Sequence, residues 1–147
     1  MRETIPQPAV TVQSLVKRYG SQSILDGLSL SVARGAVCGV IGPSGGGKTT
    51  FLRCLNGLED FQGGQIHLAD RKLTAEQPPA ERTVALAHNR RRVGLVVQQI
   101  NLFPHRTALE NVIEAPSHVL GLSREQAIAD GRTLLERVDL GDKLQHI

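Results

Sequence analysis

One short segment governs how this chain folds: Gly42-Pro43-Ser44-Gly45-Gly46-Gly47-Lys48-Thr49-Thr50. It matches the pattern Gly-x-x-x-x-Gly-Lys-Ser/Thr. Glycines accept backbone angles that are closed to other residues, so consecutive amide groups can turn inward and surround an anion. The lysine adds a full positive charge, and the hydroxyl of the threonine after it is a ligand for Mg²⁺. The segment therefore predicts a loop that binds the phosphates of a nucleotide.

The sequence on either side supplies the context that such a loop needs. Residues 36–41 form a nearly continuous apolar run, which is typical of a central strand buried on both faces. Residues 49–58 place Phe51, Leu55 and Leu58 on one face at helical spacing. The alternative is a glycine-rich turn that ends in Lys-Thr by chance, at about one per cent from typical residue frequencies. A strand, the loop and then a helix favour phosphate binding, and we expect the nucleotide to be ATP with Mg²⁺.

Similar patterns divide the rest of the chain. We expect strands over residues 10–16, 28–32, 63–68 and 93–97, a loop over 70–82, and helices over 109–120 and 123–138. Ser123 and Gln126 predict a capping box at the start of the last helix, and Ala127, Leu134, Leu135 and Val138 predict its apolar stripe. The predicted fold class is α/β, with a strand-rich N-terminal part and a helical last third.

Composition limits the classes of protein to consider. The 147 residues suffice for one modest domain, and a 3% aromatic content with no Trp and one Tyr predicts an aliphatic core. The net charge of +3 is too small to indicate a nucleic-acid partner, and the basic residues lack interleaved aromatics. The run Arg90-Arg91-Arg92 is interpreted as a solvated loop or helix end. We expect no nucleic-acid binding.

The cysteines and the N-terminus indicate a cytosolic protein. Cys38 and Cys54 have apolar neighbours and no metal-ligand spacing, which favours free, buried thiols over a disulfide. No apolar run approaches the ~18 residues of a membrane span, and the first residues do not resemble a signal peptide. Residues 1–8 contain two prolines and no periodicity, so we expect a flexible leader.

From Val10 onward, the sequence resembles the ATP-binding subunit of ABC transporters, and most closely the branch that imports polar amino acids. Besides the phosphate loop, the likeness rests on Val93-Gly-Leu-Val-Val-Gln-Gln-Ile-Asn-Leu-Phe-Pro-His105 and on Leu109-Glu-Asn-Val112. This resemblance implies a P-loop NTPase core of the ABC type with an antiparallel β-subdomain. Residues 9–100 would hold that subdomain and the P-loop core, and residues 101–147 the Q-loop region and the start of a helical subdomain.

The resemblance also implies roles for single residues. Tyr19 falls where the family stacks an aromatic ring on adenine, although it could simply close a strand. Gln98 falls on the Q-loop glutamine that helps to bind Mg²⁺ and the attacking water, although glutamine also ends strands routinely. Thr49 and Gln98 would then be the metal ligands, and Lys48 and Gln98 the catalytic residues. The nucleotide site would comprise Tyr19, Gly42, Pro43, Ser44, Gly45, Gly46, Gly47, Lys48, Thr49 and Thr50.

Partners follow from the same resemblance. The segment from Asn101 to Thr107 lies where the family docks a membrane subunit, which would place the chain on the inner face of the plasma membrane. In the family, two ATP-binding subunits form a homodimer. The sequence contains no match to the family's Walker B carboxylate, its signature motif or its switch histidine. We therefore expect the N-terminal part of such a domain, truncated before the signature, with little or no autonomous hydrolysis.

Two alternatives stay open at this point. A non-catalytic interaction fragment would dock on a membrane subunit without turning over ATP. A different P-loop enzyme, such as a small kinase, would explain the loop but not the combination of Gln98 with Asn101-Leu-Phe-Pro-His105.

Overall fold

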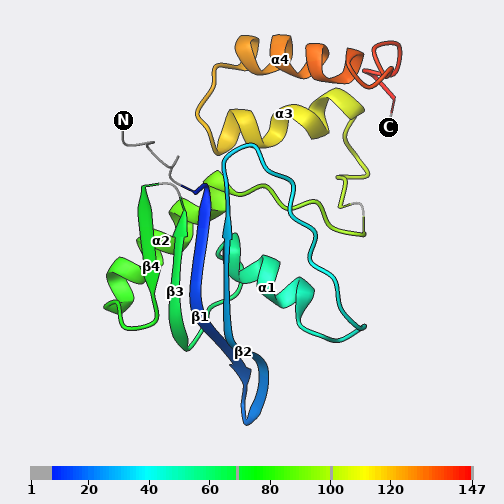
Figure 1. The fold of residues 1–147 in the computed structure, drawn as a ribbon. Coiled ribbons are helices and arrows are strands. Elements are labelled where there is room, and N and C mark those ends of the chain that lie inside the picture. Colours follow the sequence, from blue (N-terminus) through cyan, green and yellow to red (C-terminus); the bar gives the residue numbers. More distant parts are fainter. Residues whose placement is uncertain (1–7, 69, 100, 147) are drawn as a thin grey trace, which may run out of the picture. The chain divides into compact units, whose positions relative to one another are not determined.

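The computed structural model describes residues 8–68, 70–99 and 101–146, so the expected leader lies outside the described residues except for Pro8. The chain divides into two compact units, Met1–Val96 and Val97–Ile147. Each unit has its own secondary structure, which Figure 1 colours along the sequence.

The first unit is built on a four-stranded antiparallel sheet in the order β2-β1-β3-β4. Its strands are β1 (Val10–Tyr19), β2 (Gln22–Val32), β3 (Gly63–Leu68) and β4 (Arg71–Thr74). The first three confirm predicted strands, and the antiparallel subdomain is confirmed with them. The fourth lies in the stretch that we expected to be a loop.

The pairing of β1 with its neighbours is irregular near Ser14, where the register shifts on both sides of the strand. Ser14 has a φ of 47°, and Gly64 opposite has a φ of 82°. A Cβ atom on Gly64 would collide with the carbonyl oxygens of Gln13 and Ser14. Only glycine fits this close approach of two backbones.

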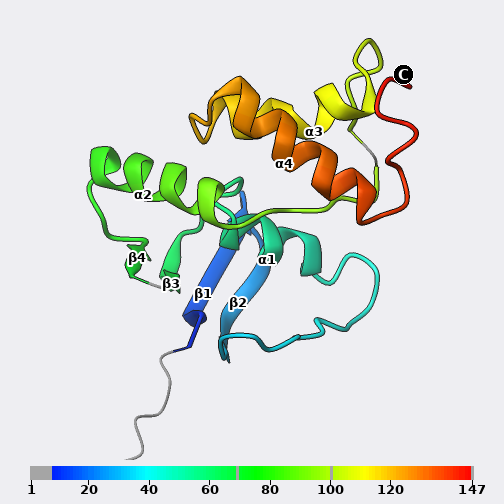
Figure 2. The same cartoon turned by 90° about the horizontal axis from the view of Figure 1, so that it is seen from above.

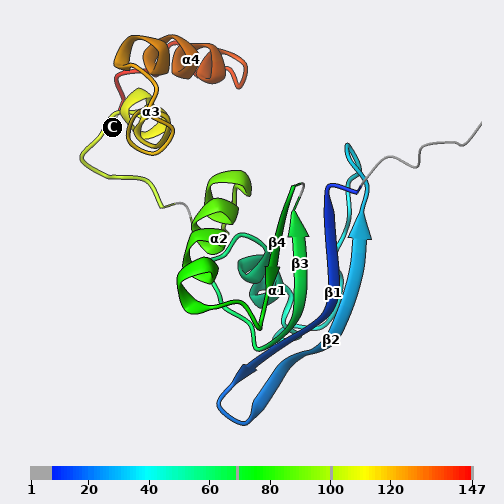
Figure 3. The same cartoon turned by 90° about the vertical axis from the view of Figure 1, so that its left-hand side faces the viewer.

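Helices α1 (Lys48–Leu55) and α2 (Pro79–Arg92) lie on one face of the sheet, as Figure 3 shows. Between this face and the helices lies the expected aliphatic core, to which two phenylalanines are added. Its buried members are Val12, Leu15, Leu25, Phe51, Cys54, Phe61, Ile66, Leu68, Leu73 and Ala85. Helix α2 was missed in the sequence, because its polar composition and Pro78-Pro79 resemble a loop. Proline is nevertheless well tolerated at the first helical position.

Two apolar segments do not form the strands that we predicted. Residues 36–41 and 93–97 lie in irregular structure, and Val37, Ile41 and Val96 are 101%, 94% and 100% exposed. A continuous apolar run gains from strand formation only when both of its faces are covered. The four described strands pair with one another, and these two segments therefore stay outside the sheet. Figure 1 shows the cyan stretch from β2 to α1 as a long loop that swings away from the sheet.

The second unit contains α3 (Ala108–His118) and α4 (Arg124–Glu136), which lie side by side in Figures 1 and 2. They pack so closely that a Cβ atom on Gly131 would lie 2.7 Å from Ile113. Of the predicted stripe on α4, Ala127 and Leu135 are buried, whereas Leu134 and Val138 are 48% and 61% exposed. The predicted burial is therefore confirmed for Ala127 and Leu135 and is wrong for Leu134 and Val138.

Side chains cap both helices of the second unit. The Ser123 hydroxyl accepts from the Gln126 amide, as predicted, but the Gln126 side chain donates to Asp130 instead of completing a capping box. A complete capping box is formed by Thr107 and Glu110 at the start of α3, which sequence analysis did not find.

Candidate nucleotide-binding site

The glycine-rich segment forms a compact turn that leads directly into α1. The Gly46 amide donates to the Pro43 carbonyl at 3.1 Å. Gly47 is buried with a φ of 81°, and a Cβ atom there would lie 3.0 Å from the Ile24 carbonyl on β2. Gly47 is also the N-cap of α1, without a side-chain cap and without an acidic residue in the first turn. The positive end of the helix dipole is therefore not neutralised by the helix's own side chains.

Lys48 is the first residue of α1 and turns back over the loop. Its Nζ donates to the Gly42 carbonyl at 3.0 Å and to the Pro43 carbonyl at 2.7 Å. The ammonium group thus lies against the loop, and its two acceptors are carbonyls of the loop itself. The remaining members of the predicted set, Ser44, Gly45, Thr49 and Thr50, are exposed or half-exposed in the same segment. The structure therefore gathers the whole predicted phosphate-binding segment at the start of one helix.

Tyr19 is the last residue of β1 and is 47% exposed. It pairs with Gln22 at the start of β2, and Ile24, two residues further on, contacts Gly47 of the loop. The tyrosine ring and the glycine-rich loop therefore lie near the same end of β2. This arrangement agrees with a nucleotide whose base and phosphates occupy neighbouring places.

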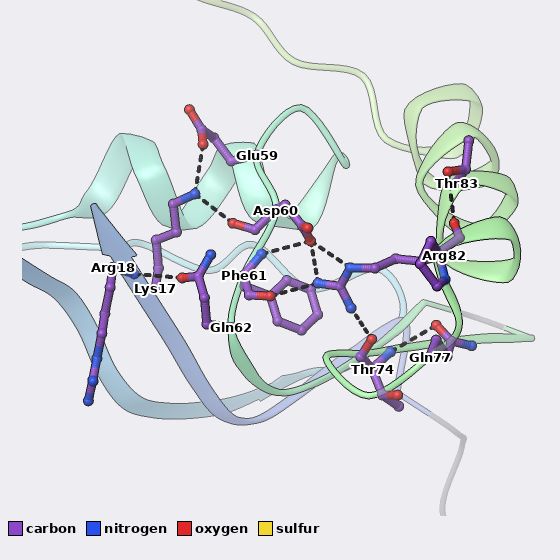
Figure 4. Close-up of polar contacts among 11 residues, drawn as sticks. Lys17, Arg18, Glu59, Asp60, Phe61, Gln62, Thr74, Gln77, Arg82 and Thr83 are labelled. Atoms are coloured by element: carbon purple, nitrogen blue, oxygen red, sulfur yellow. Dashed lines mark hydrogen bonds and ion pairs between the residues drawn. The ribbon is translucent and has the colours of Figure 1, made fainter. Parts of the chain in front are cut away.

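A polar network behind Tyr19 was not foreseen from the sequence. Figure 4 shows residues 59–62 bonded to β1 on one side and to α2 on the other. The Lys17 ammonium donates to Glu59 at 2.9 Å and to the Asp60 carbonyl at 2.7 Å, and it lies 4.5 Å from the centre of the Tyr19 ring. Lys17 is only 4% exposed, so these acceptors replace the water that its charge loses on burial.

On the other side of this network, Arg82 binds the same segment. Its guanidinium donates to the Asp60 carboxylate and to the Phe61 carbonyl, the latter at 2.7 Å, and stacks on the Phe61 ring. Burial raises the pKa of Asp60, but the Arg82 hydrogen bond and the Phe61 amide outweigh it and leave the pKa below its usual range. The Lys17 hydrogen bond lowers the pKa of Glu59. The burial of Lys17 and Arg82 could not be predicted from the sequence, because neither composition nor periodicity distinguishes a buried cation from an exposed one.

The two cysteines differ from each other. Both are free, as expected, but only Cys54 is buried, at 0% exposure, whereas Cys38 is exposed. The expectation of two buried thiols is therefore wrong for Cys38, because the segment that carries it stays outside the sheet. Burial raises the pKa of the Cys54 thiol to about 11.

Gln98 and residues 101–107 belong to the second unit. Gln98 is exposed in an irregular segment. The following loop is braced by Asn111 of α3, whose side chain accepts from the Phe103 amide at 2.8 Å and donates to the Phe103, Arg106 and Thr107 carbonyls. This brace leaves Leu102 and Phe103 64% and 45% exposed. Sequence analysis noted Asn111 only as part of a family-like stretch.

The Mg²⁺ site predicted from Thr49 and Gln98 remains a prediction, since the two residues lie in different units. No helix among the described residues is long and apolar enough to cross a membrane.

Comparison with known families decides what kind of protein this is. A model of the ABC transporter family matches residues 25–147. The chain therefore belongs to the ABC transporter family. This membership confirms the predicted P-loop fold and argues against a small kinase.

Individual relatives agree with the ABC assignment. The chain is 43% identical to the L-cystine transport system ATP-binding protein TcyN of Escherichia coli over 135 residues, covering 92% of this chain and 54% of that protein. It is 44% identical to the arginine/ornithine transport ATP-binding protein AotP of Pseudomonas aeruginosa over 137 residues, covering 90% and 54%. The chain thus spans about half the length of these curated relatives.

A solved structure supports the same fold. The chain resembles a dimeric ATP-binding cassette in a post-hydrolysis state with ADP and Pi, at a TM-score of 0.72 and 27% identity. The alignment covers 93% of this chain and 60% of that one.

Proposed function

We propose that this chain binds Mg²⁺-ATP through residues 42–50 and serves as the ATP-binding subunit of an ABC importer for polar amino acids. The observation that carries the proposal is the glycine-rich turn, with Lys48 folded over it at the uncapped start of α1. In that place, a triphosphate would replace the loop carbonyls as the partner of the ammonium group. The transport of polar amino acids is supported by the relatives named for cystine and arginine/ornithine.

Each proposed site residue has a separate task. Tyr19 stacks on the adenine ring, and Lys48 binds the terminal phosphates. The Thr49 hydroxyl coordinates Mg²⁺, and Gln98 of the second unit contributes to the metal and to the attacking water. Amides of the loop from Gly42 to Thr50 surround the phosphate oxygens.

The proposed partner of the second unit is a membrane subunit of the transporter, which would hold the chain at the inner face of the plasma membrane. Support comes from the braced loop that exposes Leu102 and Phe103. Beside it lies a hollow of about 600 Å³ whose lining includes His105, Arg106 and Glu114. A second ATP-binding subunit is the other proposed partner, as in the family's homodimers.

ATP turnover by this chain alone is proposed to be slight. Hydrolysis requires charge compensation and activation of a water, for which the family uses its Walker B carboxylate and switch histidine. Neither motif has a match in the sequence. A non-catalytic role at a membrane subunit remains a second candidate, favoured by the exposed Leu102 and Phe103. Mg²⁺-dependent phosphate release by the purified chain, absent from Lys48→Ala, would exclude this second candidate.

Nucleotide binding is tested by titration with a fluorescent ATP analogue in the presence of Mg²⁺. We expect Lys48→Ala to weaken binding about tenfold or more, because a charge-assisted hydrogen bond to phosphate is lost. Lys72→Ala on exposed β4 is the matched control and should bind like the wild type. ATP at about 100 times its dissociation constant should also stabilise the wild type by ~2.7 kcal/mol. Equal binding by wild type and Lys48→Ala, or none by either, would contradict the proposal.

A further inference from the structure

A buried cation lies against the proposed adenine platform. Lys17 and Tyr19 are two residues apart at the end of β1. The Lys17 Nζ is 4.5 Å from the centre of the Tyr19 ring, within the range of a cation–π interaction. Lys17 is 4% exposed and Tyr19 is 47% exposed. The buried ammonium therefore occupies one face of the ring, and the tyrosine as a whole keeps about half of its surface exposed.

The ammonium group has a fixed orientation. It carries three N–H donors, of which two are satisfied by the Glu59 carboxylate at 2.9 Å and the Asp60 carbonyl at 2.7 Å. The remaining side of the ammonium faces the aromatic ring. Every partner of this buried charge is thus named, and one of them is the π face of Tyr19.

The Asp60 carbonyl that accepts from Lys17 belongs to a segment with further bonds, to α2 and to β1. Arg82 of α2 binds the Asp60 carboxylate and the Phe61 carbonyl. The backbone amide of Gln62 donates to the Val16 carbonyl at 2.9 Å, and the Gln62 side-chain oxygen accepts from the backbone amide of Arg18 at 2.8 Å. Figure 4 shows the Arg82 bonds to Asp60 and Phe61 and the bond between Arg18 and Gln62. The segment therefore anchors β1 on both sides of Lys17.

From this arrangement we infer that Lys17 is a positioning residue for Tyr19, which it holds so that only the opposite ring face is offered to a purine base. Glu59 and Asp60 orient Lys17, and Lys17 orients the ring. The inference rests on the proposed function, because it gives the base of the bound nucleotide its place. A ring that is already ordered loses less conformational freedom on stacking, and binding is correspondingly tighter.

The ring can be followed without any nucleotide, since the chain has one Tyr and no Trp. We expect Lys17→Met, which keeps the aliphatic stem and removes the charge, to increase acrylamide quenching of the Tyr19 emission and to lower its anisotropy. The matched control is Arg18→Met, the loss of one exposed charge at the next position, and it should leave both signals unchanged. Unchanged signals in Lys17→Met would show that the lysine does not order the ring and would overturn the inference.

Binding tests the functional part through a double-mutant cycle with Tyr19→Ala. Lys17→Met should weaken ATP binding about three- to tenfold in the wild-type background and not at all in the Tyr19→Ala background. Binding of inorganic tripolyphosphate, which has no base, should be unaffected by Lys17→Met. An equal loss for tripolyphosphate and ATP, or an equal loss with and without Tyr19, would show a general effect on the fold and would overturn the inference.

Two further outcomes are separated by the same experiments. If Lys17→Met does not fold, as seen by circular dichroism, Lys17→Gln takes its place, because its amide can still donate to the Asp60 carbonyl but carries no charge. A smaller loss of ATP binding that again vanishes in Tyr19→Ala would support the inference, and no coupling would overturn it. If the wild type binds no ATP, the proposed function fails, and the quenching comparison alone decides whether Lys17 orders the ring.

Discussion

Strand β1 and residues 36–41 are both rich in β-forming side chains, yet they end in opposite states. Val12 and Leu15 of β1 are 1% and 0% exposed, whereas Val37 and Ile41 are 101% and 94% exposed. β1 has β2 on one side and β3 on the other, and both pairings are antiparallel. The difference shows that a strand sequence becomes a strand only where its neighbours are supplied.

The source of the neighbours explains the contrast. β1 and β2 are joined by a short turn, so the loop to be closed is small and its entropic cost is low. Their half-buried pattern needs cover on one face, which α1 and α2 provide. A continuous apolar run such as residues 36–41 needs strands beside it and layers on both faces. The four described strands pair among themselves and leave the run without this cover.

The largest effect that we predict compares Gly64, on the strand β3 that pairs with β1, with Gly39 in residues 36–41. Gly64→Ala should destabilise the first unit by about 3 kcal/mol or more, because a Cβ atom would meet the Gln13 and Ser14 carbonyls at a positive φ. Gly39→Ala should change stability by less than about 0.5 kcal/mol, since open space surrounds that position. Urea unfolding followed by circular dichroism measures both. A comparable loss in Gly39→Ala would show that residues 36–41 are packed in solution.

The second prediction compares Cys54, in the packed core of the first unit, with Cys38, in residues 36–41. Cys54, on α1, is fully buried with a pKa raised to about 11, so at pH 8 only about one thiol in a thousand is ionised. Cys38 is exposed. We expect a maleimide to modify Cys38 about a hundredfold faster than Cys54 or more, because the Cys54 thiol is buried and almost entirely protonated, whereas Cys38 is open to the reagent.

Mass spectrometry of the labelled chain measures the two rates, and Cys38→Ser and Cys54→Ser assign them. In 6 M guanidinium, both thiols should react alike, which controls for intrinsic reactivity. Slow labelling of Cys38 in the native chain would mean that residues 36–41 are covered, and the contrast between the two regions would be lost.

The local parts of the fold were predictable from the sequence. β-Branched residues and alternation predicted strands within β1 and β2, and a strand was predicted from Gly63 through β3. Glycine spacing predicted the loop before α1, and Ser123 predicted the start of α4. These signals depend on neighbours along the chain, so they survive whatever the rest of the molecule does. The strands expected at residues 36–41 and 93–97 depend on partners distant in the chain, and there the predictions were wrong.

In the candidate site, too, some residues could be predicted from the sequence around them, whereas others depend on partners distant in the chain. Residues 42–50 were predicted because their types and spacing carry the chemistry, and Tyr19 was predicted from the resemblance to ABC ATP-binding subunits. Lys17, Arg82 and Asn111 were missed, because their importance lies in being buried or bonded to a remote segment. Their only trace in the sequence is a charged or amide side chain, which most often lies on the surface. α2 was missed because propensity favoured a loop and tertiary packing overrode it.

The third prediction compares two cations: Arg82 of α2, which is bonded within the packed part of the first unit, and Lys48, which is bonded to the glycine-rich loop. Arg82→Met removes bonds to Asp60 and to the Thr74 and Phe61 carbonyls, and should cost about 2 kcal/mol. Lys48→Met removes bonds to exposed carbonyls of its own loop only, and should cost less than about 0.5 kcal/mol. Chemical denaturation gives both values. A loss in Lys48→Met as large as in Arg82→Met would contradict the view that the loop adds little to stability.

The smallest predicted effect is the dependence of stability on pH through Asp60. Residues 33–50 contain no Asp or Glu, so they contribute no carboxylate to this effect. The folded-state pKa of Asp60 lies below its usual range, so the carboxylate stabilises the fold above its unfolded pKa. That contribution is lost as pH falls through the lower folded-state value. At neutral pH it should be about 1 kcal/mol or less, because the side chain is 54% exposed and water screens the pair with Arg82.

Asp60→Asn therefore should be less stable than the wild type at pH 7, and the difference should shrink between about pH 5 and pH 3. Urea midpoints across this range measure it. The control is Asp26→Asn on β2, since the Asp26 side chain is exposed and forms no ion pair within the described part of the chain. A gap that stays constant with pH would mean that the Arg82 pair does not depend on the charge of Asp60. The neutral hydrogen bonds of residues 59–62 would then suffice to hold the segment against β1 and α2, and the ordered region would owe its state to packing rather than to its ion pairs.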